Sequence, residues 1–129
     1  MAGPVNGSPS DGSASTGLRL VVVDNDQAVL DLLLLDLQLE GHTIVATAAD
    51  GDEAVRVCRE NLPDVLVVDL RLGRGVNGLE VVRRVQPLGL RAVLFTNYVT
   101  PDVVDDARHL GAVVIEKGNL YALRRAVTG

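Results

Sequence analysis

Residues 63–73 read PDVLVVDLRLG. Within this stretch the aliphatic residues at 65–68 form an unbroken apolar run between two aspartates, Asp64 and Asp69. A short continuous run of Val and Leu with polar residues on both sides is typical of a parallel strand that is buried on both faces. The pattern therefore predicts a strand over 65–69 that ends on Asp69.

Four further aliphatic runs flank this strand along the chain, and segments with helical periodicity separate them. The predicted strands are 18–23, 43–46, 92–95 and 112–115, and the predicted helices are 26–40, 52–61, 77–86, 101–110 and 119–127. Asp26 and Asn77 suit helix N-caps, and Pro101 suits a first helical position. Strand alternates with helix five times, which predicts an α/β fold with a doubly wound, five-stranded parallel sheet.

Length and composition predict one folded domain. The chain has 129 residues and a mass of 13.6 kDa, which is the size of a single domain. Ten of the residues 1–17 are Gly, Ser or Pro, so we expect 1–17 to be a disordered tail and 18–129 to fold. No apolar run reaches the roughly 18 residues of a membrane helix. The single cysteine, Cys58, excludes an internal disulfide framework and favours a reducing, cytoplasmic setting.

The charge and the aromatic content argue against a nucleic-acid partner. The formal net charge is −5, whereas nonspecific nucleic-acid binding needs a basic surface. The aromatic residues are only Phe95, Tyr98 and Tyr121, too few for a platform that stacks the bases of single strands. The arginine pairs at 83–84 and 124–125 are expected on solvated helix faces.

Polar residues that can bind or accept a phosphoryl group follow the predicted strands. Asp24, Asn25 and Asp26 follow the first strand, Asp69 the third, Thr96 the fourth and Lys117 the fifth. The carboxyl ends of parallel strands meet at one edge of the sheet, where such folds bind ligands. Clustered carboxylates suit Mg²⁺, an aspartate can act as a nucleophile toward phosphorus, and Thr and Lys side chains can bind phosphoryl oxygens.

Several motifs together resemble the receiver domain of two-component response regulators. They are VVV with Asp24-Asn25-Asp26, PDVLVVDLRLG with Asp69, VLFTN with Thr96, and VVIEK with Lys117, supported by AADGDEAV at 48–55 and NGLEVVRRV at 77–85. The resemblance spans residues 18–127. It implies a flavodoxin-like (βα)5 receiver fold and a response regulator of the stand-alone, single-domain type.

The resemblance also implies roles for individual residues. Asp69 would accept a phosphoryl group from a histidine kinase or a phosphotransfer protein. Asp24, Asn25, Asp69 and the backbone carbonyl of Arg71 would hold Mg²⁺. Thr96 and Lys117 would contact the phosphoryl oxygens and couple their arrival to the face formed by the fourth helix, fifth strand and fifth helix, where a downstream protein would bind. The domain would have at most self-phosphorylation and autodephosphorylation activity.

The sequence departs from the family pattern at several positions, three of which concern the metal site, the turn after the lysine and the switch. Asn25 stands where a second carboxylate is usual, so we expect weaker Mg²⁺ binding unless Asp26 turns inward; a role for Asp26 as the cap of the first helix is favoured. Gly118 replaces the proline that usually follows the lysine, so we expect a different turn. Val114 stands at the usual position of an aromatic switch residue, and Tyr98 could take a related part.

The first predicted helix has two apolar stripes. One stripe is expected to face the sheet. The second, which we call the α1 stripe, consists of Ala28, Leu32, Leu35 and Leu39 and has the spacing of a short coiled-coil seam. It predicts a docking face for a partner helix or for a second copy of the chain; the alternative is that the final helix covers it.

Two other functions remain open at this stage. A haloacid-dehalogenase-like phosphatase would use Asp24 as the nucleophile and Asp26 as the general acid. Only twelve residues follow Lys117, however, which leaves no room for that family's later acidic metal motif. The third hypothesis, motivated by Asn25, Val114 and Gly118, is a receiver-like interaction module that works without phosphorylation. The presence of Asp69 argues against it.

Overall fold

The computed structural model describes residues 17–129, which form one five-stranded parallel sheet in the order β2-β1-β3-β4-β5. The strands are β1 (Arg19–Val23), β2 (Thr43–Ala48), β3 (Val65–Val68), β4 (Arg91–Thr96) and β5 (Val113–Glu116). The helices are α1 (Gln27–Leu39), α2 (Gly51–Asn61), α3 (Gly78–Val85), α4 (Pro101–His109) and α5 (Leu120–Thr128). The predicted doubly wound α/β fold is thus confirmed. Of the predicted tail, 1–17, all but Gly17 lies outside the described residues.

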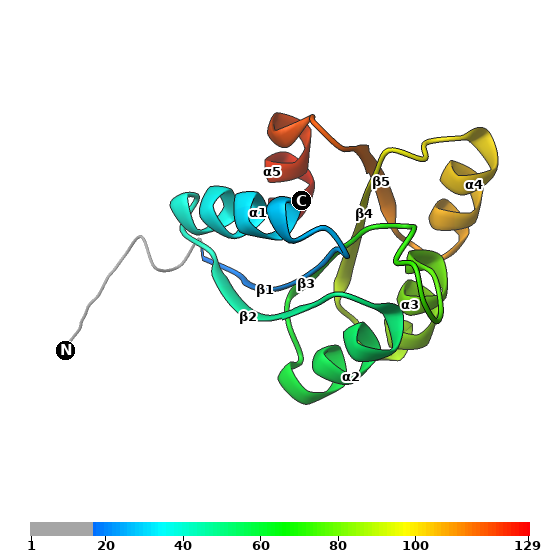
Figure 1. Ribbon diagram of the computed structural model, residues 1–129, viewed down its shortest axis with the longest axis horizontal. Coiled ribbons are helices and arrows are strands. Elements are labelled where there is room, and N and C mark those ends of the chain that lie inside the picture. The colour runs from blue at the N-terminus through cyan, green and yellow to red at the C-terminus, as the bar shows by residue number, and fades with distance from the viewer. Residues whose placement is uncertain (1–16) are drawn as a thin grey trace.

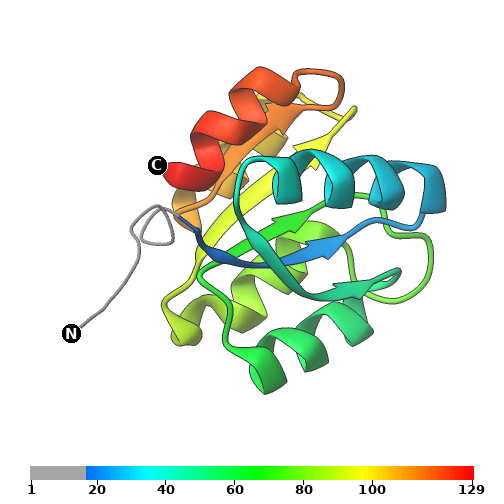
Figure 2. The ribbon, with the colours of Figure 1, turned by 90° about the vertical axis from the view of Figure 1, so that its left-hand side faces the viewer.

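The helices cover both faces of the sheet (Figures 1 and 2). Helices α1 and α5 lie on one face, where Leu33 and Leu123 pack against the strands. Helices α2, α3 and α4 lie on the other, where Val57 and Val81 are buried. Strand β3 is buried on both faces, since each of its four residues is at most 1% exposed. This explains the unbroken aliphatic run in its sequence.

The pairing register brings the predicted polar residues together. Val23 of β1 pairs with Val68 of β3, so the following residues, Asp24 and Asp69, leave neighbouring strands at the same level. Thr96 of β4 pairs with Glu116 of β5, and Lys117 follows directly. The carboxyl edge of the sheet therefore collects all four residues.

Helix boundaries follow from their caps. The side chain of Asp26 accepts a hydrogen bond from the amide of Ala28 at 2.9 Å and caps α1, and Asn77 caps α3 in the same way. Pro101 occupies the first position of α4. Pro87 lies in a short 3-10 turn, Gln86–Leu88, that follows α3, because proline lacks the amide that a continuing α-helix needs.

One sequence-based expectation about the surface is wrong. Arg124 of α5 does not lie on a merely solvated face: its guanidinium forms an ion pair with Asp36 of α1, a residue that is only 8% exposed. The pair joins the two helices that cover the same face of the sheet. It could not be found from local sequence because the partners are 88 residues apart.

Candidate phosphorylation site

Two buried aspartates form the centre of the site. Asp24 is 1% exposed and Asp69 is 4% exposed, which is unusual for charged side chains unless they are paired. Lys117 supplies the pairing: its Nζ lies 2.8 Å from Oδ2 of Asp24 and 2.7 Å from Oδ2 of Asp69. The three side chains carry a net charge of −1.

The two aspartates also determine the ionisation of Lys117. Burial by itself would lower the pKa of the ammonium group, but the hydrogen bonds to Asp24 and then Asp69 outweigh it, so the net pKa lies above its ordinary value. Lys117 is therefore a fixed positive charge at neutral pH. It is also the only lysine in the chain.

The two oxygens of Asp69 have different surroundings. Oδ2 accepts the hydrogen bond from Lys117, whereas Oδ1 is buried and no donor among residues 17–129 reaches it. A buried polar atom without a partner is costly in free energy. The atom is therefore ready to bind an incoming group. Asp24 differs, because its Oδ1 accepts the amide of Asp26 at 2.9 Å.

Thr96 lies on the neighbouring strand and is fully buried. Its Oγ1 accepts a hydrogen bond from the amide of Tyr98 at 3.2 Å, and its carbonyl accepts the amide of Lys117 at 3.0 Å. Within residues 17–129 the Thr96 hydroxyl donates to no acceptor, so its hydrogen is available to a ligand.

Tight backbone packing supports the phosphoacceptor position. A Cβ on Gly78, the first residue of α3, would lie 2.1 Å from the carbonyl oxygen of Asp69. The Gly78 amide also donates to the carbonyl of Leu70 at 2.8 Å. Only glycine allows α3 to approach this closely, and the contact fixes the backbone on which the Asp69 side chain stands.

The remaining predicted residues lie around this centre. Asn25 is exposed, and its amide faces Gly73 in the loop between β3 and α3. Tyr98, in the loop between β4 and α4, is 43% exposed, and the Arg71 guanidinium stacks 4.0 Å from its ring centroid. Val114 of β5 is half-buried against the core beneath α4. Gly118 has a φ of +95°, so the turn after Lys117 uses a conformation that favours glycine.

A comparison with known families gives this geometry a context. The model of the response regulator receiver domain matches residues 20–121. The chain belongs to the response regulator receiver family. Receiver domains are signalling domains of two-component systems, and they generally bind Mg²⁺ at their phosphorylation site and interact with histidine kinases and downstream partners.

Curated bacterial relatives support the assignment. PdtaR, a transcriptional regulatory protein of Mycobacterium tuberculosis, is 30% identical over 118 residues, which are 88% of this chain and 53% of that protein. AfsQ1, a transcriptional regulatory protein of Streptomyces coelicolor, is 40% identical over 67 residues, 52% of this chain and 29% of AfsQ1. The chain thus spans about half of the first relative and less than a third of the second.

Solved structures share the fold. The receiver domain of the response regulator NarL of M. tuberculosis has a TM-score of 0.78 and 27% identity, with 88% of this chain and 98% of that chain covered. A chain of the CheX–CheY–BeF3–Mg²⁺ complex of Borrelia burgdorferi has a TM-score of 0.79 and 22% identity, with coverages of 84% and 85%. The second likeness concerns the fold alone.

The oxygen donors of this receiver fit Mg²⁺, but they carry less negative charge than a site with two acidic residues before α1. Asp24 and Asp69 bring two carboxylates to one point, and an excess negative charge remains after Lys117 is counted. Oxygen donors and negative charge are what Mg²⁺ requires. Residues 17–129 contain no group of three or more His, Cys, Asp or Glu that could hold a metal ion. Asp26 is not among these donors, because its side chain caps α1.

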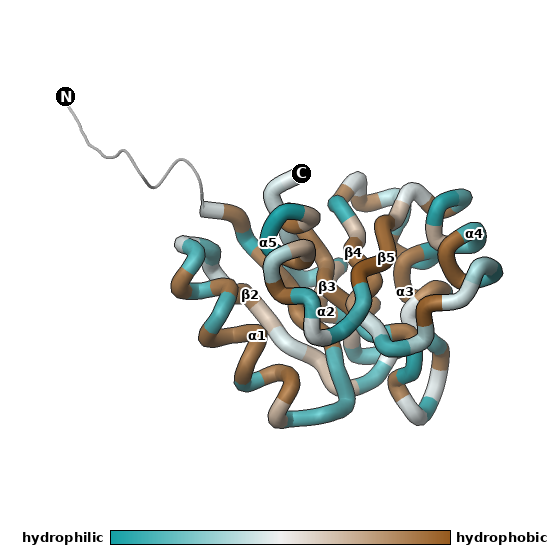
Figure 3. Tube along the Cα trace, turned by 90° about the horizontal axis from the view of Figure 1, so that it is seen from above, coloured by the Kyte–Doolittle hydropathy of each residue, from teal (hydrophilic) through white to brown (hydrophobic). Residues whose placement is uncertain are grey.

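The α1 stripe is exposed beside the site. Leu32, Leu35 and Leu39 are 49%, 60% and 76% exposed, so α5 does not cover them. Figure 3 shows hydrophobic positions recurring along α1. Leu32 also lines a cavity of about 290 Å³ that includes Phe95 and Lys117, which connects the stripe to the carboxyl edge of the sheet.

Among residues 17–129 no helix has the length and apolar character that crossing a membrane requires.

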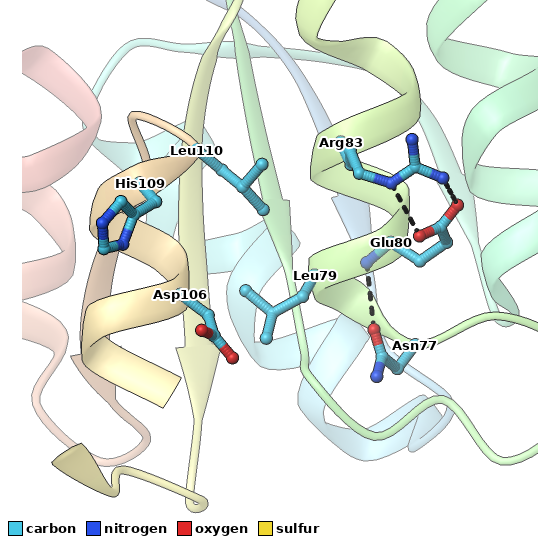
Figure 4. Close-up of a pocket in the computed structure, with 7 residues that line it drawn as sticks. All are labelled: Asn77, Leu79, Glu80, Arg83, Asp106, His109 and Leu110. Atoms are coloured by element: carbon cyan, nitrogen blue, oxygen red, sulfur yellow. Dashed lines mark hydrogen bonds and ion pairs between the residues drawn. The ribbon is translucent and has the colours of Figure 1, made fainter. Parts of the chain in front are cut away.

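A second cavity, of about 430 Å³, lies between α3 and α4 (Figure 4). Leu79 and Leu110 form its apolar part, and Glu80 pairs with Arg83 at its rim. Hydrogen bonds from Arg83 and then from Arg84 lower the pKa of Glu80 to about 2. None of the residues predicted for phosphoryl transfer lines this cavity.

Proposed function

We propose that this receiver accepts a phosphoryl group on Asp69. The observation that carries the proposal is the Asp69 carboxylate itself: one oxygen is held by Lys117, while the other is buried and meets no donor among residues 17–129. The family membership, the pairing of Lys117 with both Asp24 and Asp69, and the place of Thr96 at the same edge of the sheet support the same function.

The proposed donor is a phosphohistidine of a histidine kinase or a phosphotransfer protein. An oxygen of Asp69 forms a bond to phosphorus while the bond from phosphorus to the donor nitrogen breaks, and the electron pair of that bond stays on the imidazole. Lys117 neutralises part of the incoming negative charge, and the Thr96 hydroxyl donates a hydrogen bond to a phosphoryl oxygen.

A magnesium ion belongs to the same proposal. Asp24, Asp69, Asn25 and the backbone carbonyl of Arg71 are its proposed ligands. When bound, Mg²⁺ supplies positive charge that offsets the repulsion between the carboxylate and the phosphoryl group. Because Asn25 is neutral, we propose that binding is weaker than with two acidic residues before α1.

The proposed output is a change at the face formed by α4, β5 and α5. Thr96 begins the loop that leads to α4, and the Lys117 amide bonds to the Thr96 carbonyl, so both phosphoryl-binding residues adjoin this face. Tyr98 is the proposed switch residue, with Val114 as a packing position beneath α4. The proposed unit is 18–129, acting in the cytoplasm on a downstream protein, without direct binding to nucleic acid or membrane.

The α1 stripe is the proposed docking face for the phosphodonor. Leu35 and Leu39 are large, exposed apolar side chains on one helix face, and a helix of a partner can cover such a face. A second copy of the chain is the alternative occupant.

The two alternative functions make different demands on the site. A phosphatase that uses Asp26 as its general acid needs this side chain beside Asp24, but Asp26 is exposed and caps α1. A module that works without phosphorylation has no need of a buried carboxylate oxygen without a donor, so the surroundings of Asp69 favour the phosphoacceptor.

The proposal is tested by intact mass after incubation with acetyl phosphate and Mg²⁺. We expect one phosphoryl adduct on the wild type and none on Asp69→Asn. An adduct that survives Asp69→Asn but disappears in Asp24→Asn would instead support the phosphatase hypothesis. No adduct with any small donor would support the phosphorylation-independent module.

A further inference from the structure

The stack between Arg71 and Tyr98 is the feature of the site that the proposed function leaves unexplained. The guanidinium of Arg71 lies 4.0 Å from the centroid of the Tyr98 ring. Both side chains are exposed, so the contact buries little surface. An exposed cation–π contact of this kind is weak, and its contribution to the stability of the fold is correspondingly small.

The backbone places this stack at the same edge of the sheet as the phosphoacceptor. Asp69 directly follows β3, and Thr96 is the last residue of the neighbouring strand β4. Arg71 and Tyr98 each lie two residues further along, in the loops that leave the same edge. Tyr98 is also fixed to the site, because its amide donates to Thr96 Oγ1 at 3.2 Å. The stack therefore joins the two loops that leave the carboxyl edge of the sheet after β3 and β4.

The charges of the site show what Arg71 can bind. Lys117 is already shared by two carboxylates at 2.7 and 2.8 Å. By contrast, Arg71 makes no ion pair with any carboxylate of residues 17–129. A phosphoryl group on Asp69 replaces one negative charge by about two. Its oxygens match the fork of N–H donors on a guanidinium.

We propose that Arg71 is a further phosphoryl-binding residue, which rests on the Tyr98 ring and transfers to the phosphoryl oxygens when Asp69 is modified. This inference rests on the proposed function. Arginine–phosphate hydrogen bonds are stronger than an exposed cation–π contact, so the transfer is favourable. As a consequence, the Arg71 guanidinium no longer covers the Tyr98 ring, which lies at the start of the loop to α4. Val114, at the usual position of the aromatic switch residue, offers no aromatic side chain.

Tyrosine emission reports on this movement directly. The chain has two tyrosines and no tryptophan, and Tyr121 is 67% exposed on α5. Tyr121→Phe therefore leaves Tyr98 as the only tyrosine, so that the tyrosine emission comes from its ring alone. We expect beryllium fluoride with Mg²⁺, a stand-in for the phosphoryl group, to change this emission, and we expect Arg71→Gln to abolish the change.

The matched control is Arg74→Gln. Arg74 lies in the same loop and is exposed. Its replacement by glutamine removes the same charge at a similar place in the chain. We expect the Kd for beryllium fluoride to rise about tenfold in Arg71→Gln, the scale of one charge-assisted hydrogen bond, and to change less than twofold in Arg74→Gln. Tyr98→Leu should lower the Kd about two- to fivefold, because it removes the cation–π contact that competes with beryllium fluoride for the Arg71 guanidinium.

The outcomes separate this inference from the proposed function. Equal Kd values for Arg71→Gln and Arg74→Gln, with binding intact in the wild type, overturn the role of Arg71 and leave Asp69 as the acceptor. An emission change that persists in Arg71→Gln overturns it as well. No binding by the wild type, together with no acetyl phosphate adduct, overturns the proposed function and this inference with it.

Discussion

Replacing Lys117 with methionine tests the electrostatic design of the site. Methionine keeps an unbranched side chain of similar length but removes the charge that Asp24 and Asp69 share. The two Oδ2 atoms lie at most about 5.5 Å apart, the sum of their distances to Nζ. At an effective dielectric constant of about 20, two unit charges at that separation repel by roughly 3 kcal/mol.

The repulsion sets the expected loss of stability. Because Lys117 retains some contact with solvent, we expect Lys117→Met to lower the free energy of unfolding by about 2–4 kcal/mol at pH 7, near the lower end for removing one partner of a buried ion pair. Urea unfolding followed by far-UV circular dichroism measures this loss. Arg74→Met, which removes an exposed cation, is the control and should change stability by less than about 0.5 kcal/mol.

The pH dependence has a defined sign. In the wild type, the raised pKa of Lys117 means that its contribution is complete below the ordinary lysine pKa, about 10.4, and is lost as the pH rises through the folded value.

A second substitution isolates the cause. Asp24→Asn added to Lys117→Met removes the repulsion and should restore most of the lost stability, which makes the two substitutions strongly non-additive. If Lys117→Met is as stable as the wild type at pH 7, or if Asp24→Asn lowers its stability further, the electrostatic account of this site is wrong.

Three further predictions concern other parts of the molecule. Asn25→Asp should lower the Kd for Mg²⁺ about tenfold in calorimetric titration, since it adds a charged oxygen donor; an unchanged Kd would place position 25 outside the metal site. On α1, Leu33→Ala should cost about 2–5 kcal/mol in urea unfolding because Leu33 is 1% exposed, whereas Leu35→Glu should cost less than about 0.5 kcal/mol; similar losses would contradict the two-stripe assignment. Burial raises the pKa of the Cys58 thiol to about 12, so iodoacetamide at pH 8.5 should alkylate the urea-unfolded chain but not the native one, and equal rates by mass spectrometry would show that Cys58 is accessible.

The sequence was sufficient to predict the sheet and the centre of the site because both depend on strand position. The aliphatic run at 65–68 is typical of a strand buried on both faces, and a parallel register then brings Asp24 and Asp69 to one edge. The cap role favoured for Asp26 followed from its place before an apolar helix and is confirmed.

Contacts between side chains of separate elements were not predictable in the same way. The sequence assigns Arg71 only a backbone carbonyl as a metal ligand, and it assigns Tyr98 a part related to that of the switch residue. Their stack depends on the paths of two loops, which have no periodic pattern. The pair of Asp36 and Arg124 was missed for the same reason, because helix periodicity places each residue on a face but does not identify its partner.

The central claim is that Asp69 is the phosphoacceptor, and mapping of the modified residue tests it most directly. Borohydride reduces an aspartyl phosphate to homoserine, and trypsin cleavage after Arg59 and Arg71 releases the peptide 60–71, which contains Asp64 and Asp69. After treatment with acetyl phosphate and Mg²⁺, tandem mass spectrometry should locate homoserine at 69. Homoserine at Asp64 or at Asp24, with position 69 unchanged, would contradict the account.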